Sequence, residues 1–346
     1  MNSRFPRSTV VLAGLVATAL TLTSCGGGER TPQGSDGDTV RVVTSTNVWG
    51  SVVQAVGGDA VDVQAIITGT SADPHSYEST PRDAVTVAQA QLVVVNGGGY
   101  DEFVERILAG GSGEPPVVRA VSLAAGAEHR AEQHDTGHEE HTHEEPDAKE
   151  TTDAAPSTRA HTDEHGHTHQ HGDNEHVWYD LPTVEAVAHR VAEELGRLRP
   201  DRKDEFTRNA ERFATQVHQL HERLTELHRT TPDAPVLATE PVAQLLLEDA
   251  GLRDVTPETF RQAVEEENDP PAAAVAEVEQ LISGGQVQVV VHNPQTESPV
   301  TARVRDRAAA AGIPVVEMTE TLPEGKDYLS WMTEQVNALA TALGRS

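Results

Sequence analysis

The sequence predicts an α/β protein with two lobes, each built on a parallel sheet, joined by a long helix. Short β-branched runs alternate with segments of helical periodicity, which favours parallel sheets with helices on their faces. The run 92–95 is apolar without alternation, which is typical of a strand covered on both faces. Residues 201–229, between the two sets of strands, carry one continuous apolar stripe.

The first lobe is expected over residues 40–200. Its predicted strands are 39–45, 61–67 and 92–96, and its predicted helices are 48–56, 81–89, 101–108 and 183–198. In a sheet of this kind, ligands collect beyond the carboxyl ends of the strands.

Residues 128–175 interrupt this alternation. Apolar residues almost vanish there, so the segment cannot bury enough apolar surface to offset the entropy cost of ordering, and we expect a disordered loop. Two short tracts in this loop have closely spaced histidines, a composition typical of metal binding. These histidines are His141, His143, His165, His167, His169 and His171. We expect them to capture zinc and raise its local concentration; the alternative is a solvated linker.

The linking helix is expected over residues 201–230, with apolar residues at spacings of four and three. From 201 to 229 it would be about 40 Å long, enough to cross a domain boundary. The second lobe, expected over 231–346, repeats the alternation of the first. Its predicted strands are 236–239, 287–292 and 314–318, and its predicted helices are 242–250, 272–283, 299–311 and 328–343.

The N-terminus has the pattern of a secretory signal. Arg4 and Arg7 precede an uncharged apolar run over 10–22, which is too short to span a membrane as a mature helix. Cys25, the only cysteine, lies in a Leu-Thr-Ser-Cys-Gly segment that resembles a bacterial lipobox. The domains expected here are a signal peptide over 1–25, with Cys25 lipidated, and a flexible tether over 26–39.

A lipidated Cys25 would anchor the exported chain to the outer face of the cytoplasmic membrane. The alternative is a leftover cysteine in an ordinary signal. The formal net charge of −29 disfavours nucleic acids and anionic membrane surfaces as partners, because contacts to phosphates need Lys and Arg. This charge suits a cationic ligand, although acidic surfaces also serve solubility.

Two histidines of the first lobe are candidate metal ligands. His75 follows the predicted strand 61–67, where ligands collect in open sheets; the alternative is an exposed loop histidine. His176 follows the histidine-rich loop, and Trp178 and Tyr179 beside it would hold its imidazole in place; the alternative is that it is simply the last histidine of that loop.

Two carboxylates of the second lobe complete the candidate set. Glu240 follows the predicted strand 236–239 and so faces the cleft between the lobes; the alternative is an acid favoured by a helix dipole. Asp327 precedes the helix 328–343, and on its own this position favours an N-cap. Two imidazoles with two carboxylates would suit Zn, Mn or Fe(II), and the lack of an available thiol disfavours Cu(I).

The segments 73–78, 176–180 and 328–332 resemble those of the metal-binding solute-binding proteins of ABC importers, the zinc and manganese uptake lipoproteins. The resemblance covers nearly the whole mature chain, including the acidic histidine-rich loop and the long helix. It implies two α/β lobes bridged by a rigid helix, with the metal in the cleft between them. It also implies a membrane permease as partner, and we expect the chain to act as a monomer.

Carried over one position at a time, the resemblance implies His75 and His176 as the ligands of the first lobe. Glu240 falls where the family has its third ligand, a histidine in many zinc binders and a glutamate in some manganese binders. Asp327 lies next to the position of the family's fourth ligand, an aspartate.

The histidine-rich loop favours Zn²⁺ over Mn²⁺, because neutral imidazoles bind borderline metals such as zinc better than manganese. We therefore expect a zinc-binding protein of an importer, with a manganese-specific protein of the same type as the alternative. A metal-binding surface adhesin or a zinc-storage lipoprotein is another alternative. Neighbouring genes for a permease and an ATPase would favour the importer protein over these two. We expect no enzyme, because neither a His-Glu-x-x-His helix nor a Gly-x-Ser-x-Gly elbow is present.

Overall fold

The computed structural model describes residues 39–124 except 71 and 112, the stretches 161–162 and 168–169, and residues 174–344. The predicted signal peptide, Cys25 and the tether lie outside the described residues, as does most of the histidine-rich loop. In the part of the chain that is described, no helix is both long and apolar enough to cross a membrane.

The first lobe contains a four-stranded sheet with the order β2-β1-β3-β4, in which every pair is parallel. Its elements are β1 (Val40–Thr46), α1 (Asn47–Gly57), β2 (Val61–Ile67), α2 (Pro81–Ala88), β3 (Leu92–Val95), α3 (Glu102–Gly110), β4 (Val117–Arg119) and α5 (Leu181–Leu198). Every strand and helix predicted for this lobe is confirmed to within a few residues. The edge strand β4 was not predicted, because three residues are too few to show a period.

The second lobe contains another four-stranded parallel sheet, with the order β10-β9-β7-β8. Its elements are β7 (Pro235–Ala238), α7 (Gln244–Asp249), β8 (Arg253–Asp254), α8 (Glu258–Glu265), α9 (Ala272–Ser283), β9 (Val289–His292), α10 (Pro299–Ala310), β10 (Val315–Glu317) and α11 (Tyr328–Ala342). The predicted elements are again confirmed, and the helix expected over 242–250 begins as a 3₁₀ turn, Pro241–Ala243. β8 and α8 were not predicted.

The central strands of both sheets are covered on two faces, which explains their uninterrupted apolar runs. In β3, Leu92 and Val94 belong to one apolar cluster, whereas Val93 belongs to another on the opposite face. In β9, Val291 and Val290 divide in the same way. Successive side chains of a strand point to opposite faces, so a strand buried on both sides needs apolar residues at every position.

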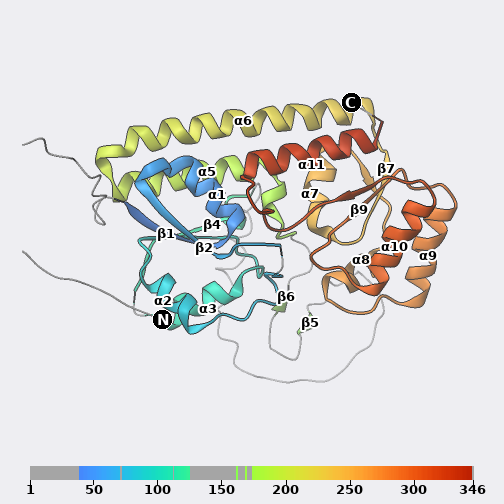
Figure 1. Ribbon diagram of the computed structural model, residues 1–346, viewed down its shortest axis with the longest axis horizontal. Helices are drawn as coiled ribbons and strands as arrows, with labels where there is room; N and C mark the ends of the chain where they lie inside the picture. Colours follow the sequence, from blue (N-terminus) through green and yellow to red (C-terminus); the bar gives the residue numbers. More distant parts are fainter. Residues whose placement is uncertain are drawn as a thin grey trace, which may run out of the picture. The chain divides into compact units, whose positions relative to one another are not determined.

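The linking helix α6 (Lys203–Thr230) has 28 residues, and is about 42 Å long. It packs on α1 and α5 of the first lobe and on α7 and α11 of the second (Figure 1). Its buried residues form the predicted stripe: Phe206, Ala210, Phe213, Val217, Leu220, Leu224 and Leu227. One apolar cluster therefore runs through both lobes, from Val94 in β3 through this stripe to Val236 in β7.

Only short pieces of the predicted disordered loop, 128–175, are described. β5 (His161–Thr162) pairs in antiparallel fashion with β6 (Thr168–His169). Asn174 and Glu175, at the end of the loop, precede a 3₁₀ turn, Val177–Tyr179. The disorder of the remainder stays a prediction, and so does the capture of zinc by its histidines.

The shared apolar cluster can be tested at Leu224, which has no exposed surface. Replacing a buried leucine by alanine leaves a cavity, so Leu224→Ala should lower the free energy of unfolding by about 2–5 kcal/mol. Thr225→Ala, on the exposed face of the same helix, should change it by less than about 0.5 kcal/mol. Urea unfolding of the metal-free protein measures both values. Equal values for the two variants would contradict a core that passes through α6.

Candidate metal centre

A cavity lies between the lobes, beyond the carboxyl ends of strands from both sheets. It has about 290 Å³ of space not filled by atoms, part of it open to solvent. The lining residues are Asp73, His75, His176, Glu240, Val264, Glu265, Glu267, Thr296 and Glu320. All but two of them are histidines or carboxylates, at the place where open α/β sheets bind their ligands.

His75 is held by its own loop and by an aromatic ring. Asp73 accepts a hydrogen bond from the backbone N–H of His75 (2.9 Å) and another from the Ser76 hydroxyl (3.1 Å). The imidazole meets the ring of Tyr100 edge-on, with ring centroids 4.8 Å apart. The side chain keeps 29 % of its surface exposed, so solvent reaches the imidazole.

His176 is almost completely buried, with 2 % of its surface exposed. Its Nδ1 lies 2.8 Å from the side-chain oxygen of Asn174, whose amide nitrogen donates to the carbonyl of Pro241 at 3.0 Å. Because that amide oxygen can only accept, Nδ1 carries the proton and Nε2 keeps its lone pair. Burial, together with the charge of His75, lowers the pKa of His176 well below its ordinary value, so the imidazole is neutral.

Glu320 reaches the same place from the second lobe, three residues after β10. Only 2 % of its surface is exposed, and its two oxygens accept from the Tyr100 hydroxyl (3.1 Å) and the Asn293 amide (2.8 Å). Potential ligand atoms of His75, His176 and Glu320 all lie within 4.8 Å of one another. Tyr100 therefore contacts members of this group from both lobes.

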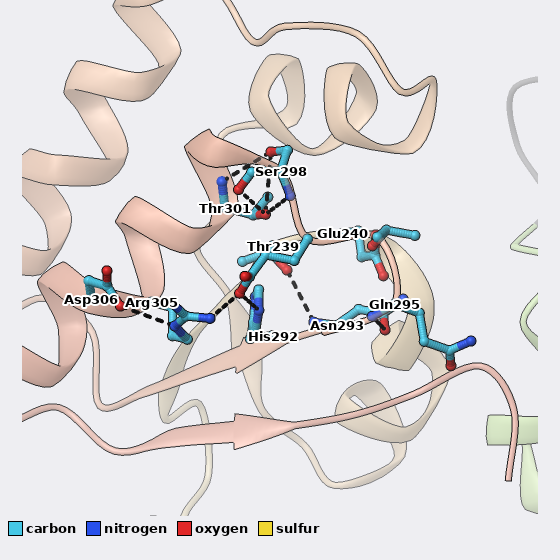
Figure 2. Close-up of polar contacts among 11 residues, drawn as sticks. Thr239, Glu240, His292, Asn293, Gln295, Ser298, Thr301, Arg305 and Asp306 are labelled. Atoms are coloured by element: carbon cyan, nitrogen blue, oxygen red, sulfur yellow. Dashed lines mark hydrogen bonds and ion pairs between the residues drawn. The ribbon is translucent and has the colours of Figure 1, made fainter. Parts of the chain in front are cut away.

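The loop between β9 and α10 contacts both buried carboxylates of the second lobe, Glu240 and Glu320. Figure 2 shows Asn293 of this loop and Glu240. Asn293 donates to Glu320, and the Thr296 hydroxyl donates to one oxygen of Glu240 at 2.5 Å. Glu240 is only 5 % exposed, and its other oxygen is buried without a hydrogen-bond partner among the described residues. A buried carboxylate oxygen without a donor is costly unless a cation compensates it.

This loop is anchored at both ends. At the end of β9, Nε2 of the buried His292 lies 3.0 Å from the Glu297 carboxylate, to which Arg305 of α10 also donates (Figure 2). Ser298 caps α10 through a reciprocal box with Thr301. These contacts fix the loop that positions the cavity carboxylates.

Asp327, predicted as a ligand, is not among the residues that line the cavity. Its side chain caps α11 by accepting from the backbone N–H of Ser330 at 2.7 Å, while its own N–H donates to the Ser330 hydroxyl. One oxygen of this carboxylate is therefore used by the N-terminal backbone of α11, and Glu320 lines the cavity while Asp327 does not. The strand-end rule that points to Glu240 also applies to Glu320, which follows the predicted strand 314–318.

A second group of potential ligands lies beside the first and shares His75 with it. Ligand atoms of His75, Glu175 and Glu265 all lie within 4.8 Å of one another. The Nδ1 atom of His75 is 3.5 Å from Oε1 of Glu175. Glu265 was missed because α8 was missed; the signal for this helix is the spacing of Phe260 and Val264, which are buried one turn apart.

Burial raises the pKa values of these carboxyl groups. The pKa of Glu240 rises to about 7 and that of Glu320 to about 8. The pKa of Glu175 rises to about 7, and that of Glu265 to about 9, where nearby negative charges add to burial. Both causes disfavour the ionised form, which a bound cation would stabilise.

The donor set fits a divalent transition metal. Neutral imidazole nitrogens and carboxylate oxygens in a small buried space suit Zn²⁺, Mn²⁺ or Fe²⁺. The one cysteine of the chain, Cys25, lies outside the described residues. The predicted His75, His176 and Glu240 are brought to one cavity, together with the unpredicted Glu320 and Glu265.

Known proteins with similar sequences carry metal-binding names. Residues 42–342 match the family described as "Zinc-uptake complex component A periplasmic". The manganese-binding lipoprotein MntA of Halalkalibacterium halodurans is 23 % identical over 224 residues, which cover 63 % of this chain and 59 % of that protein. The high-affinity zinc uptake system protein ZnuA of Paracoccus denitrificans is 38 % identical over 184 residues, 53 % of this chain and 56 % of that protein. The chain thus spans less than two thirds of either relative.

The fold has solved counterparts. The solute-binding protein FpvC of Pseudomonas aeruginosa, solved in complex with Mn²⁺, matches with a TM-score of 0.64 at 18 % identity. The match covers 88 % of this chain and 99 % of that one. At this identity the likeness concerns the fold, and it confirms the predicted architecture of two parallel sheets with a long linking helix.

The raised pKa values predict that metal affinity depends on pH. Below about pH 7 both Glu240 and Glu320 hold protons that a metal ion must displace, whereas His176, with its lowered pKa, is already neutral. Affinity should therefore rise with pH, by at least about tenfold between pH 6 and pH 8, with protons released on binding. Competition titrations and calorimetry in two buffers measure both effects. An affinity that is flat over this range would contradict the protonated carboxyls.

Asn174 is predicted to keep the proton of His176 on Nδ1, which leaves the lone pair of Nε2 available to a metal ion. Asn174→Ala removes the acceptor that keeps the proton on Nδ1, so metal affinity should fall about 10–100-fold. Asn174→Asp keeps an acceptor there and should lose much less. Chelator competition compares the two variants, and circular dichroism checks their folding. Wild-type affinity in Asn174→Ala would rule out this role.

Proposed function

Because the chain belongs to the zinc-uptake component A family of metal-binding solute-binding proteins, a non-enzymatic family, we propose that it captures Zn²⁺ outside the cytoplasmic membrane and delivers it to an importer. The partner would be the membrane permease of an ABC transporter. A lipidated Cys25 would keep the protein at the outer face of the membrane.

The observation that carries this proposal is the convergence of His75, His176 and Glu320, whose ligand atoms lie within 4.8 Å of one another. Glu240 is the proposed fourth ligand, because it lines the same cavity and one of its oxygens is buried with no partner within the described ranges. With four protein ligands of this kind, the site would be closed and compact. Such a site serves to hold an ion, whereas a catalytic zinc keeps an open position for water.

Two features favour zinc as the ion. A closed set of two imidazole nitrogens and two carboxylate oxygens is compatible with tetrahedral zinc, while manganese prefers more oxygen ligands in an octahedral arrangement. The histidines between 141 and 171 would add weaker sites for zinc. The relatives have names of both kinds, so manganese is the alternative that the experiment must exclude.

The experiment compares Zn²⁺ with Mn²⁺ on the mature protein and on a variant in which residues 128–173 are replaced by a short Gly/Ser linker. The variant keeps Asn174 and Glu175, because both contact the cavity histidines. Chelator competition should give one tightly bound Zn²⁺ in the variant, held at least about 100-fold more tightly than Mn²⁺. A variant that binds no metal, or that prefers Mn²⁺, would refute the proposal.

The ligand assignment has a matched control. Glu320→Gln and His176→Ala should each lower zinc affinity by at least about tenfold, because each removes a ligand. Asp327→Asn also removes a carboxylate from the second lobe but keeps a good N-cap, so zinc affinity should not change. A loss in Asp327→Asn together with wild-type affinity in Glu320→Gln would reverse the assignment.

A further inference from the structure

We propose that His75, Glu175 and Glu265 form a second cation position at the outer side of the cavity, through which the metal ion passes to and from the inner ligands. The inner ligands are His75, His176 and Glu320. This inference rests on the proposed function, because the ion that uses the outer position is the one that the inner ligands hold.

The outer position is built from three separate parts of the chain. His75 comes from the loop after β2, Glu175 from the end of the histidine-rich segment, and Glu265 from the last residue of α8. Their ligand atoms lie within 4.8 Å of one another, as close as those of the inner group. One imidazole nitrogen and two carboxylate oxygens are a reasonable partial shell for zinc.

Exposure decreases from the outer group to the inner one. The side chains of His75 and Glu175 are 29 % and 17 % exposed, whereas His176 and Glu320 each expose only 2 % of their surface. An ion arriving from solvent therefore meets the outer group first. His75 belongs to both groups, so an ion that moves inward stays beside the same imidazole ring.

A separate observation indicates that this cavity needs a cation. Glu240 lines the cavity with His75 and Glu265, and in the described part of the chain its buried Oε1 has no hydrogen-bond partner. Arg261, the basic residue one turn before Glu265 on α8, is engaged elsewhere. It pairs with Asp254 at 3.3 Å and with Glu258. The charge of Arg261 is the weakest of the influences on the pKa of Glu265, so a cation in the cavity would compensate negative charge that Arg261 leaves.

The two positions are too close to be filled together. They share His75, and two divalent ions a few ångströms apart repel each other strongly at the low effective dielectric of a protein. The outer position therefore acts as a relay, occupied in transit. A relay position lowers the energy barrier for both capture and release of the metal ion. It therefore changes both rate constants, whereas their ratio, which is the affinity, changes much less.

The test measures zinc capture and release by stopped-flow on the full mature protein, with Zn²⁺ and a chromophoric chelator. Ions on the histidine-rich loop should exchange quickly, so the slow phase reports the cavity. Glu265→Gln should slow both capture and release by about tenfold or more, while the affinity shifts by less than about threefold. Glu175→Gln should do the same, which keeps the test valid if one variant folds poorly.

Glu266→Gln is the matched control, because it removes the same charge from the neighbouring exposed residue, which does not line the cavity. Its rates should stay within about twofold of wild type. Wild-type rates in both Glu265→Gln and Glu175→Gln would overturn the relay. So would faster release with unchanged capture, which would make these residues ligands of the inner ion. Failure of the wild-type protein to bind Zn²⁺ would instead refute the proposed function.

Discussion

The apolar cluster shared by the two lobes is the constraint on which the rest of the structure depends. The stripe of α6 packs against helices of both lobes, and the cluster reaches both sheets. Because close-packed interiors resist deformation, the strand ends of one lobe keep a fixed distance from those of the other. The loops after β2, β7 and β10 can therefore bring His75, Glu240 and Glu320 to one cavity without a hinge motion to assemble them.

Hydrogen bonds hold the cavity carboxylates close together in spite of their mutual repulsion. Tyr100 and Asn293 fix both oxygens of Glu320, and Thr296 fixes one oxygen of Glu240. Protons can stand in for the metal, because burial raises the pKa of both carboxyls to about neutrality. The metal-free protein should accordingly lose stability as the pH rises from the ordinary carboxyl pKa of 4.5 to about 7 to 8, because over this range the folded protein holds protons that the unfolded chain has released.

Much of this arrangement could be predicted from the sequence, because periodicity and strand ends are local signals. The position of ligands beyond strand ends predicted His75 and Glu240. The aromatic residues beside His176 indicated that its imidazole is fixed in place. The ligand role of Asp327 was implied by the resemblance alone, whereas its place before a helix favours a cap, and in the structure its side chain caps α11. Glu265 depends on the short helix α8, and Tyr100 on a loop contact between lobes, which no local pattern encodes.

Asn174 links the protonation of His176 to the distance between the two lobes. One end of its amide sets the proton of His176, and the other end is bonded to Pro241, the residue that follows Glu240 in the opposite lobe. Any force that draws the lobes apart at this point must break the bond to Pro241 and free the amide to turn. The imidazole then loses its fixed tautomer at the moment when Glu240 withdraws. A force that separates the lobes slightly at this point would thus weaken the binding of the ion.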